Sequence, residues 1–393
     1  MPKLPECGCS QKLFAEFFAG IGLVHLALQQ SGWRCAYAND IDVKKCEMYT
    51  GHFGPAPYFH LEDVWQTSHI LANLPDAPFL ATASFPCIDL SLAGHCKGFD
   101  GEHSSTYFGF LNVVREMVAR PRVVMLENVT GFLTSRGGAD FRRAVIELAT
   151  LGYYMDAIVL DARVFLPQSR PRTFVFGYHE SLESHLIKRH DASGISADWR
   201  AAMEASPMLR PPPILKAMDA IELPTGWATQ PFNQPAARKY RLADFINADP
   251  DADWWTPQTT QQHLDLMEPP TRRRVNQALA SNAAWVGAAF RRTRHGAART
   301  EVRFDMAGCL RTPKGGSAKQ IIVAIENGTL RMRWMTAREY ANLQGAPDYQ
   351  ITVPELQAMY GFGDGVCVPV IRWIDQNILT PIYNASAATS AVA

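Results

Sequence analysis

The stretch that decides the fold is KLFAEFFAGIG, residues 12–22. It begins with an apolar run of strand length, Lys12–Phe18, and two glycines follow directly, before the helical pattern of Val24–Ser31. A strand, a tight turn and a helix in this order are typical of the first unit of an α/β sheet. The glycines allow the backbone to approach a ligand and expose amide groups at the start of the helix. By itself the motif is equally compatible with a turn that serves packing alone.

The alternation of strand and helix patterns continues to about residue 180. Further runs of strand length are Cys35–Asn39, Phe79–Ser84, Val123–Leu126, Met155–Leu160 and Arg172–Phe176. Helical patterns lie between them at Val43–Tyr49, Phe108–Arg120 and Asp140–Leu151. This order predicts an α/β fold, a mostly parallel sheet with helices on both faces. Ligands of such folds bind beyond the carboxyl ends of the strands, so the residues that follow each strand are the candidates for chemistry.

Prolines become frequent between about residues 180 and 260, and the regular pattern is lost there. Since proline interrupts helices and central strands, this change predicts a second domain with long loops. Regular patterns return at Thr336–Gln344 and Val366–Ile378, which predict helices. The small and polar residues 384–393 are expected to fray.

The composition excludes several classes of protein. With 393 residues and 47% hydrophobic residues, the chain can fill two cores, which rules out a wholly disordered chain. Its eight cysteines include no C-x-x-C pair, which argues against a disulfide scaffold and against a structural zinc site. The sequence shows neither a signal-peptide pattern nor an apolar run of membrane-spanning length. We therefore expect a soluble protein of a reducing cytoplasm.

Charge is distributed unevenly along a chain whose formal net charge is zero. Residues 271–340 contain fourteen Lys and Arg but four Asp and Glu, which gives this segment a net charge of +10. The segment includes a glycine-containing loop with basic flanks, residues 311–317. Such an excess suits the phosphates of a nucleic acid. The alternative, a solvated face whose charges pair among themselves, is less favoured.

Acidic residues follow the next strand-like elements. Asp40 comes about 20 residues after the glycine turn, a spacing suited to the two hydroxyls of a ribose. Asp63 follows the next element, and no third glycine completes a dinucleotide fingerprint. These residues favour a single nucleoside over a dinucleotide as the ligand.

Later strand ends carry groups capable of catalysis. Pro86 and Cys87 follow one apolar run, and Glu127 follows the next. The ends of neighbouring parallel strands meet at one edge of a sheet, so we expect Cys87 and Glu127 to face one cavity. Taken alone, a cysteine among apolar residues is more often a packing residue, and Glu127 is equally compatible with a loop-capping acid. Arg170 and Arg172 precede the last of these strands and point the same way, with a surface pair as the simpler alternative.

In this order, the motifs resemble those of the cytosine-C5 DNA methyltransferase family, of the bacterial or phage modification type. The matching residues are Phe18-Ala19-Gly20-Ile21-Gly22, Pro86-Cys87, Glu127-Asn128-Val129, Gln168-x-Arg170-x-Arg172, Arg338–Gly345 and Gly363–Val366. The resemblance covers nearly the whole chain, while residues of about 180–330 match only in general character. Three residues depart from the family: Ile88 stands where Gln is usual, Leu23 where a small residue is common, and Asp364 where Asn is frequent.

The resemblance implies the Rossmann-like fold of S-adenosylmethionine-dependent methyltransferases, a mixed seven-stranded sheet with helices on both faces, and a smaller target-recognition domain. It places the catalytic domain at residues 1–180 and 352–393, and the target-recognition domain with its hinge at residues 181–351. The implied partner is double-stranded DNA, and the chain would act as a monomer in the cytoplasm, at the nucleoid, with no membrane involved. Whether a cognate restriction enzyme is encoded alongside stays open.

The resemblance also assigns roles to residues, and it implies no metal. The residues implied to bind S-adenosylmethionine are Phe18, Ala19, Gly20, Ile21, Gly22, Asp40, Ile41, Asp63, Val64, Pro86, Asp364 and Val366. Those implied to contact DNA are Ser91, Lys97, Arg311, Lys314, Gly315 and Gly316. Cys87 would attack carbon 6 of a flipped-out cytosine, and carbon 5 would then accept the methyl group. Glu127, in its protonated form, and Arg172 would stabilise the ring, with Arg170 supporting the site.

Three alternatives differ in one feature each. An enzyme that methylates adenine N6 or cytosine N4 would carry Asp/Asn/Ser-Pro-Pro-aromatic where this chain has Phe85-Pro86-Cys87-Ile88. A tRNA cytosine-C5 methyltransferase shares the motifs, but the long basic segment favours DNA. A catalytically silent DNA-binding relative would have lost a catalytic residue, and here all of them are present.

Overall fold

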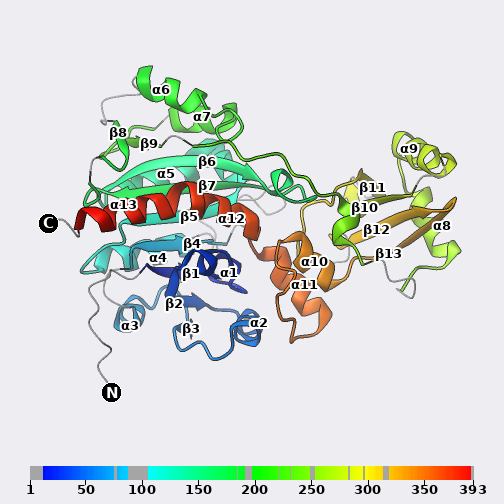
Figure 1. The fold of residues 1–393 in the computed structure, drawn as a ribbon, viewed down its shortest axis with the longest axis horizontal. Helices are drawn as coiled ribbons and strands as arrows, with labels where there is room; N and C mark the ends of the chain where they lie inside the picture. The colour runs from blue at the N-terminus through cyan, green and yellow to red at the C-terminus, as the bar shows by residue number, and fades with distance from the viewer. Residues whose placement is uncertain are drawn as a thin grey trace.

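The computed structural model describes residues 12–74, 78–86, 105–183, 185–190, 197–219, 221–230, 232–247, 253–281, 284–294, 297–312 and 318–390. Two sheets organise these residues, and Figure 1 shows the large mixed sheet at one side and a small antiparallel sheet at the other. Helices α10 (Ala337–Leu343) and α11 (Glu355–Asp364) lie between the two. Among the described residues, no helix has the length and apolar character needed to span a membrane.

The large sheet has the strand order β3-β2-β1-β4-β5-β7-β6-β9-β8. In chain order the strands are β1 (Leu13–Phe17), β2 (Arg34–Asp40), β3 (Phe59–Leu61), β4 (Leu80–Ala83), β5 (Val123–Val129), β6 (Tyr153–Asp161), β7 (Pro171–His179), β8 (Lys188–His190) and β9 (Trp227–Thr229). The first five run parallel to one another, and β7 lies antiparallel between β5 and β6. The predicted α/β fold is confirmed, but the sheet has nine strands, not seven. The extra strands, β8 and β9, have three residues each and are too short to show a pattern in the proline-rich part of the sequence.

Helices cover both faces of the large sheet, and each face has its own hydrophobic core. One face carries α1 (Leu23–Leu28), α2 (Val43–Phe53), α12 (Val368–Ile374) and α13 (Thr380–Ser390). The other carries α3 (Thr67–Asn73), α4 (Thr106–Glu116), α5 (Ala139–Ala149), α6 (Ala197–Glu204) and α7 (Pro212–Asp219). Because side chains alternate along a strand, Val123 and Met125 of β5 join the first core, while Val124 and Leu126 join the second.

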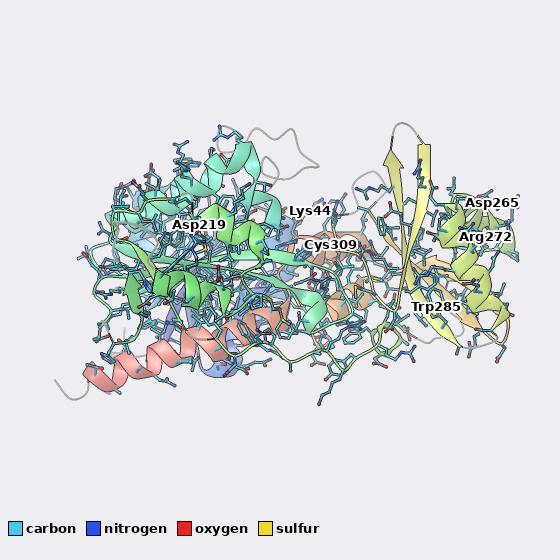
Figure 2. All side chains as sticks on the ribbon, turned by 90° about the horizontal axis from the view of Figure 1, so that it is seen from above. Lys44, Asp219, Asp265, Arg272, Trp285 and Cys309 are labelled. Atoms are coloured by element: carbon cyan, nitrogen blue, oxygen red, sulfur yellow. The ribbon has the colours of Figure 1, made fainter. Side chains whose placement is uncertain are left out.

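The small sheet was not foreseen from the sequence. Its strands are β10 (Trp285–Arg294), β11 (Ala297–Phe304), β12 (Gln320–Glu326) and β13 (Thr329–Trp334), in the order β11-β10-β12-β13. Helices α8 (Pro257–Asp265) and α9 (Pro269–Ala280) lie beside it, and Val275 packs with Ile321, Val323 and Met332 in its core. Figure 2 shows the β10–β11 hairpin beside α8 and α9, with Arg272 on α9.

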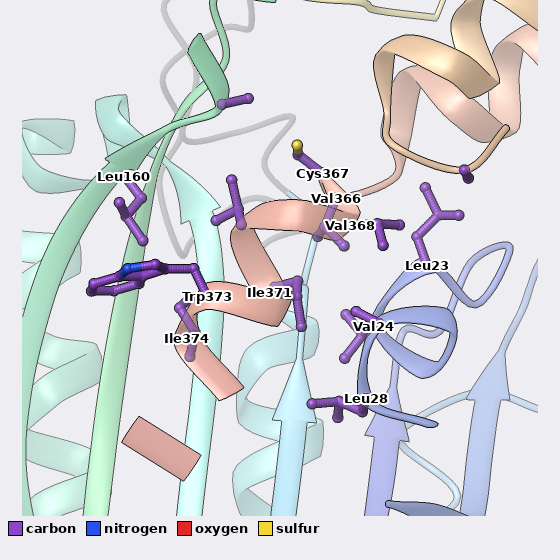
Figure 3. Packing of buried hydrophobic residues seen from close by; sticks show 14 of the residues in the cluster. Leu23, Val24, Leu28, Leu160, Val366, Cys367, Val368, Ile371, Trp373 and Ile374 are labelled. Atoms are coloured by element: carbon purple, nitrogen blue, oxygen red, sulfur yellow. The ribbon is translucent and has the colours of Figure 1, made fainter. Parts of the chain in front are cut away.

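The chain crosses between the two sheets and returns. Residues 188–229 add β8 and β9 to the large sheet and α6 and α7 to one of its faces, before the chain enters the small sheet. After α11 it comes back, and Figure 3 shows Val366, Val368 and Ile371 beside Leu23 and Val24 of α1. The first turn of the chain after β1 and the last turn after α11 are therefore neighbours.

The C-terminal residues form a helix where the sequence led us to expect a frayed end. Helix α13 runs to Ser390, so that prediction is wrong for residues 384–390. The segment is rich in alanine, which has the highest helix propensity. Ser386 is also buried, and its hydroxyl accepts a hydrogen bond from Arg122 near the start of β5.

Candidate active site

The loop between β1 and α1 has an unusual backbone. The φ angles of Phe18, Gly20 and Gly22 are +56°, +58° and +76°, a region that glycine enters without strain. At Gly22 a Cβ atom would lie 2.5 Å from the ring of Phe53 and 2.6 Å from that of Tyr49, so only glycine fits there. The loop is thus held close against α2.

Asp40, the last residue of β2, holds this loop. One oxygen of its buried carboxylate accepts a hydrogen bond from the amide of Gly20 (2.8 Å), and the other accepts one from the amide of Asp42 (2.9 Å). Each carboxylate oxygen retains a second lone pair. The carboxylate can therefore fix the loop and still accept hydrogen bonds from two neighbouring hydroxyls, as a ribose would present them.

Large apolar side chains are exposed beside these carboxylates. Ile41 is 68% exposed and Trp65 is 45% exposed, at the ends of the paired strands β2 and β3. Asp63 lies between these strand ends, and its carboxylate accepts a hydrogen bond from the amide of Trp65 (3.1 Å). Val64 is buried beneath α4 and supports this edge from inside. Exposed apolar side chains next to a carboxylate fit a flat heteroaromatic ring that carries an amine.

Helix α11 ends against the same loop. A Cβ atom at Gly361 would lie 2.7 Å from Cγ2 of Ile21, so the small residue allows this close approach. A Cβ atom at Gly363 would lie 2.6 Å from the backbone of Arg311 on the helix's other side. Buried Ala19 and Val366 complete the packing around the loop. Helix α11 therefore lies between the loop and the segment that connects β11 to β12 of the small sheet.

An ion pair links α11 to α2 across the loop. Nζ of Lys45 is 3.2 Å from the carboxylate of Asp364, the last residue of α11. The side chain of Lys45 also passes Gly20, 4.0 Å from the position of a Cβ there. Burial lowers the pKa of the Lys45 ammonium group, but the carboxylates of Asp40 and Asp364 outweigh it, and the net pKa is raised. The pair therefore stays charged at the rim of the loop.

The chain that leads to Cys87 runs beside β5. Ala83 of β4 pairs with Leu126, and the side-chain amide of Asn128 donates to the carbonyl of Phe85 at 3.1 Å. This hydrogen bond fixes the backbone directly before Pro86. Cys87 itself lies outside the described residues, as do Ser91 and Lys97.

Glu127 and Arg172 meet on neighbouring strands. Oε1 of Glu127 is 3.0 Å from Nε of Arg172, and the two side chains are 11% and 15% exposed. The register of β5 against β7 pairs Val129 with Arg172, which brings the guanidinium to the carboxyl end of β5. A carboxyl and a guanidinium thus meet next to the segment that leads to Cys87.

Arg170 is placed differently from Arg172. It is 2% exposed, and its guanidinium donates to the carbonyls of Leu310 (2.8 Å) and Gly365 (2.6 Å), which belong to segments far apart in the chain. Burial, and the nearby charge of Arg172, lower the pKa of Arg170. Its contacts tie β7 to the end of α11, so its side chain supports the site through the backbone.

Two further groups of the site carried no signal that we recognised in the sequence. One is Lys45, and the other is Cys309, whose Sγ lies 3.4 Å from Arg170 and 3.9 Å from Arg172. Cys309 comes next to β7 because Ala307 forms a β-bridge with Gln168, a contact between distant residues that no local pattern reveals. Arg311 is exposed beside this segment, while Lys314, Gly315 and Gly316 lie outside the described residues.

Comparisons with known proteins place this chain in a family. The model of the C-5 cytosine-specific DNA methylases matches residues 13–380. M.NlaX, a type II methyltransferase of Neisseria lactamica, is 27% identical over 96% of this chain and 97% of its own length. M.HhaI of Haemophilus parahaemolyticus is 32% identical over 43% of this chain and 50% of that protein. M.BsuFI of Bacillus subtilis is 31% identical over 43% of this chain, a match that spans 40% of M.BsuFI.

Solved structures of methyltransferases share the fold. EhMeth of Entamoeba histolytica matches with a TM-score of 0.61 and 12% identity, over 96% of this chain and 99% of that one. The Dnmt2 methyltransferase of S. pombe matches with a TM-score of 0.57 and 16% identity, over 94% and 98%. At such identities the likeness concerns the fold, and it confirms the predicted methyltransferase architecture. Since the family model covers nearly the whole sequence, the chain belongs to the C-5 cytosine-specific DNA methylase family, whose members are S-adenosylmethionine-dependent DNA cytosine methyltransferases.

Proposed function

We propose that this protein methylates carbon 5 of a cytosine that it flips out of a specific duplex DNA sequence, through a covalent bond between Cys87 and carbon 6. The observation that carries this proposal is the contact between Glu127 and Arg172 at the end of β5. It lies beside the segment that leads to Cys87, on the same edge of the sheet as Asp40 and the β1–α1 loop. The pair proposed to activate the pyrimidine therefore lies on the same edge of the large sheet as the proposed nucleoside site.

The residues of the cofactor site fit S-adenosylmethionine. Asp40 would accept hydrogen bonds from the ribose hydroxyls, Ile41 and Trp65 would flank the adenine, and Asp63 would accept from its amine. The cofactor supplies an electrophilic methyl group on a sulfonium. Asp364, at the end of α11, would lie near the methionine portion.

In the proposed reaction, the thiolate of Cys87 adds to carbon 6 of the cytosine, and the electrons of the double bond move towards carbon 5 and the ring. Glu127, protonated, donates to ring N3 and accepts from the exocyclic amine, while Arg172 donates to the O2 carbonyl. Carbon 5 bonds to the methyl group as the methyl–sulfur bond breaks, so that a neutral thioether leaves. Carbon 5 then loses its proton to water, and the proton on N3 returns to Glu127. Expulsion of the thiolate restores the double bond and frees Cys87.

We assign target recognition to the part of residues 181–351 that surrounds the small sheet, and catalysis to the large sheet with residues 352–393. Arginines on β10, β11 and α9 support this division, because cationic side chains neutralise DNA phosphates. The base would have to leave the duplex, since carbons 5 and 6 cannot be attacked within the stack. We expect the protein to act as a monomer, and the sequence around its gene would show whether a restriction enzyme accompanies it.

A transfer assay with tritiated S-adenosylmethionine tests the proposal. We expect label in duplex DNA, recovered as 5-methylcytosine after digestion to nucleosides, and none in tRNA. Label in tRNA alone would show that the substrate is RNA and not DNA. Label recovered as N4-methylcytosine or N6-methyladenine would contradict the chemistry assigned to Cys87.

A further inference from the structure

A second cysteine lies in the candidate active site, and the proposed reaction makes no use of it. Cys309 is located where the two parts of the molecule meet, as Figure 2 shows. Its Sγ is 3.4 Å from Nη1 of Arg170 and 3.9 Å from Nη2 of Arg172. The same Arg172 reaches Glu127 through Nε, at 3.0 Å. Arg172 therefore lies between a carboxyl and a thiol, both of which can carry a negative charge.

The position of Cys309 is fixed by the residues on either side of it. The amide of Ala307 donates to the carbonyl of Pro167 at 2.7 Å, next to the bridge between Ala307 and Gln168. The amide of Leu310 donates to the side-chain oxygen of Gln168, which is fully buried. With anchors on both sides, Cys309 is held against the start of β7.

The surroundings of Cys309 favour its ionised form. Burial raises the pKa of the Cys309 thiol, but the guanidinium groups of Arg170, Arg172 and Arg311, and the hydrogen bond from Arg172, outweigh it. Together they lower the pKa to about 7. Cys46, another partly exposed cysteine, shows the opposite shift, because burial and nearby carboxylates raise its pKa. A large fraction of Cys309 is therefore thiolate near neutral pH.

We propose that Cys309 is a positioning residue whose thiolate neutralises Arg172 when Glu127 takes up a proton, so that the guanidinium keeps its place for the target base. This inference rests on the proposed function, in which Glu127 is protonated while it contacts the cytosine. Protonation of Glu127 removes a negative charge that lies 3.0 Å from Nε of Arg172, and the loss of a counter-charge beside a largely buried guanidinium is unfavourable. The Cys309 thiolate places a negative charge 3.9 Å from Nη2 of the same guanidinium.

The pH dependence follows from the groups that surround Cys309. These are Arg170 and Arg172 at β7, Arg311 two residues after Cys309, and Tyr340 on α10, while Glu127 and Cys367 act on Arg170. Burial raises the pKa of Tyr340 to about 12, so this group stays neutral. The guanidinium groups of Arg170, Arg172 and Arg311 lower the pKa of the Cys309 thiol to about 7, near neutral pH. The thiolate is present above a pH of about 7 and is lost as the pH falls below it.

The first measurement concerns the ionisation of Cys309 itself, in a Cys87→Ser protein that lacks the proposed nucleophile. The ultraviolet absorbance of the thiolate is titrated with pH and compared with the Cys87→Ser, Cys309→Ser double variant. We expect the difference to show a midpoint near pH 7. A midpoint at the ordinary thiol value of 9.0 or above would overturn the proposal.

The second measurement is single-turnover methyl transfer to duplex DNA with Cys87 intact. The neutral variants Cys309→Ala and Cys309→Ser should be slower by roughly ten-fold or more above pH 7, with the pH dependence near 7 removed. Cys309→Asp, which restores a negative charge, should stay within about three-fold of the wild-type rate. The affinity for S-adenosylmethionine should be unchanged in all three variants, which also shows that they are folded.

Wild-type rates in the neutral variants, or an Asp variant as slow as the Ala variant, would contradict the role of charge at Cys309. These outcomes are distinct from a failure of the proposed function. In that case the wild-type protein would itself transfer no methyl group to DNA, whatever the state of Cys309.

Discussion

At the scale of single residues, the site is held together by polar side chains that bond to the backbone of other segments. Asp40 accepts from the amide of Gly20, Asn128 donates to the carbonyl of Phe85, and Arg170 donates to the carbonyl of Gly365. Each of these bonds joins two strand ends or loops that carry functional groups. Arg172, by contrast, pairs with the carboxylate of Glu127. Two arginines of the same motif therefore differ in their partners, since Arg170 bonds to the backbone and Arg172 pairs with a carboxylate.

Substitution of Arg170 should mainly reduce stability, whereas substitution of Arg172 should mainly reduce activity. Arg170→Ala leaves buried carbonyls unpaired, and we expect the free energy of unfolding to fall by about 2–4 kcal/mol. Arg172→Ala should abolish methyl transfer while lowering that free energy by about 1 kcal/mol. Urea denaturation measures the free energy of unfolding, and the transfer assay measures activity. Arg163 is exposed, so Arg163→Ala is the control that should change neither quantity. Equal loss of stability in both variants would refute this division of roles.

At the scale of elements, α11 connects the nucleoside site to the rest of the molecule. Its glycines allow the helix to touch Ile21 on one side and Arg311 on the other. Its last residue, Asp364, pairs with Lys45 of α2 across the β1–α1 loop. A change in the charge of Asp364 should therefore alter the affinity for the cofactor more than the affinity for DNA.

Substitutions at Asp364 should act on cofactor affinity according to their charge. Asp364→Asn keeps the size of the side chain and removes the ion pair, and we expect it to stay active with less than about ten-fold change in the S-adenosylmethionine dissociation constant. Asp364→Lys places two ammonium groups together beside a cationic ligand and should raise that constant by more than about ten-fold. Calorimetric titration of both variants and of the wild-type protein with S-adenosylmethionine decides. Tight binding of S-adenosylmethionine by the Asp364→Lys variant would contradict the placement of Asp364 beside the cofactor.

The elements also show what the sequence could predict. Most strands of the first 180 residues were found because each contains a run of mainly apolar residues that is buried in the sheet, whereas β3, with three residues, was not among the predicted strands. The small sheet was missed because arginines interrupt β10, β11 and β13, and such a pattern does not resemble a core strand. Helix α11 was missed because its glycines suggested a turn, whereas they serve close packing. In the site, motifs pointed to Glu127 and Arg172, but Cys309 arrives through pairing between distant residues, which no local pattern encodes.

At the scale of the whole molecule, the two sheets differ in surface charge. Several arginines around the small sheet are already paired, as Arg299 is with Glu268 and Arg292 with Glu301. Arg291 and Arg303 are exposed on β10 and β11, and neither forms an ion pair within the described part of the chain. The positive charge that is not already paired is therefore smaller than the sequence total suggests, and it includes the exposed side chains of Arg291, Arg303 and Arg311.

Removing one of these charges should alter DNA binding alone. Arg311→Ala should weaken binding to duplex DNA and, if it contacts a phosphate, reduce the slope of log affinity against log salt by about 0.9. The affinity for S-adenosylmethionine should stay the same. Fluorescence anisotropy at several salt concentrations measures the slope, with Arg200→Ala, whose partner Asp219 lies on α7, as the control. A loss of cofactor affinity in Arg311→Ala would contradict the assignment of recognition to this part of the chain.

The central claim is the covalent bond to Cys87, and a duplex that carries 5-fluorocytosine at the target position tests it most directly. Fluorine at carbon 5 cannot leave as the proton does, so the adduct cannot resolve. With S-adenosylmethionine present, the wild-type protein should form a complex with this DNA that survives denaturation, and Cys87→Ser should bind the DNA without forming it. Cys46→Ser, a cysteine on α2, should behave as the wild type does. A denaturation-resistant complex with Cys87→Ser, or its absence from a wild-type protein that methylates unmodified DNA, would contradict the account.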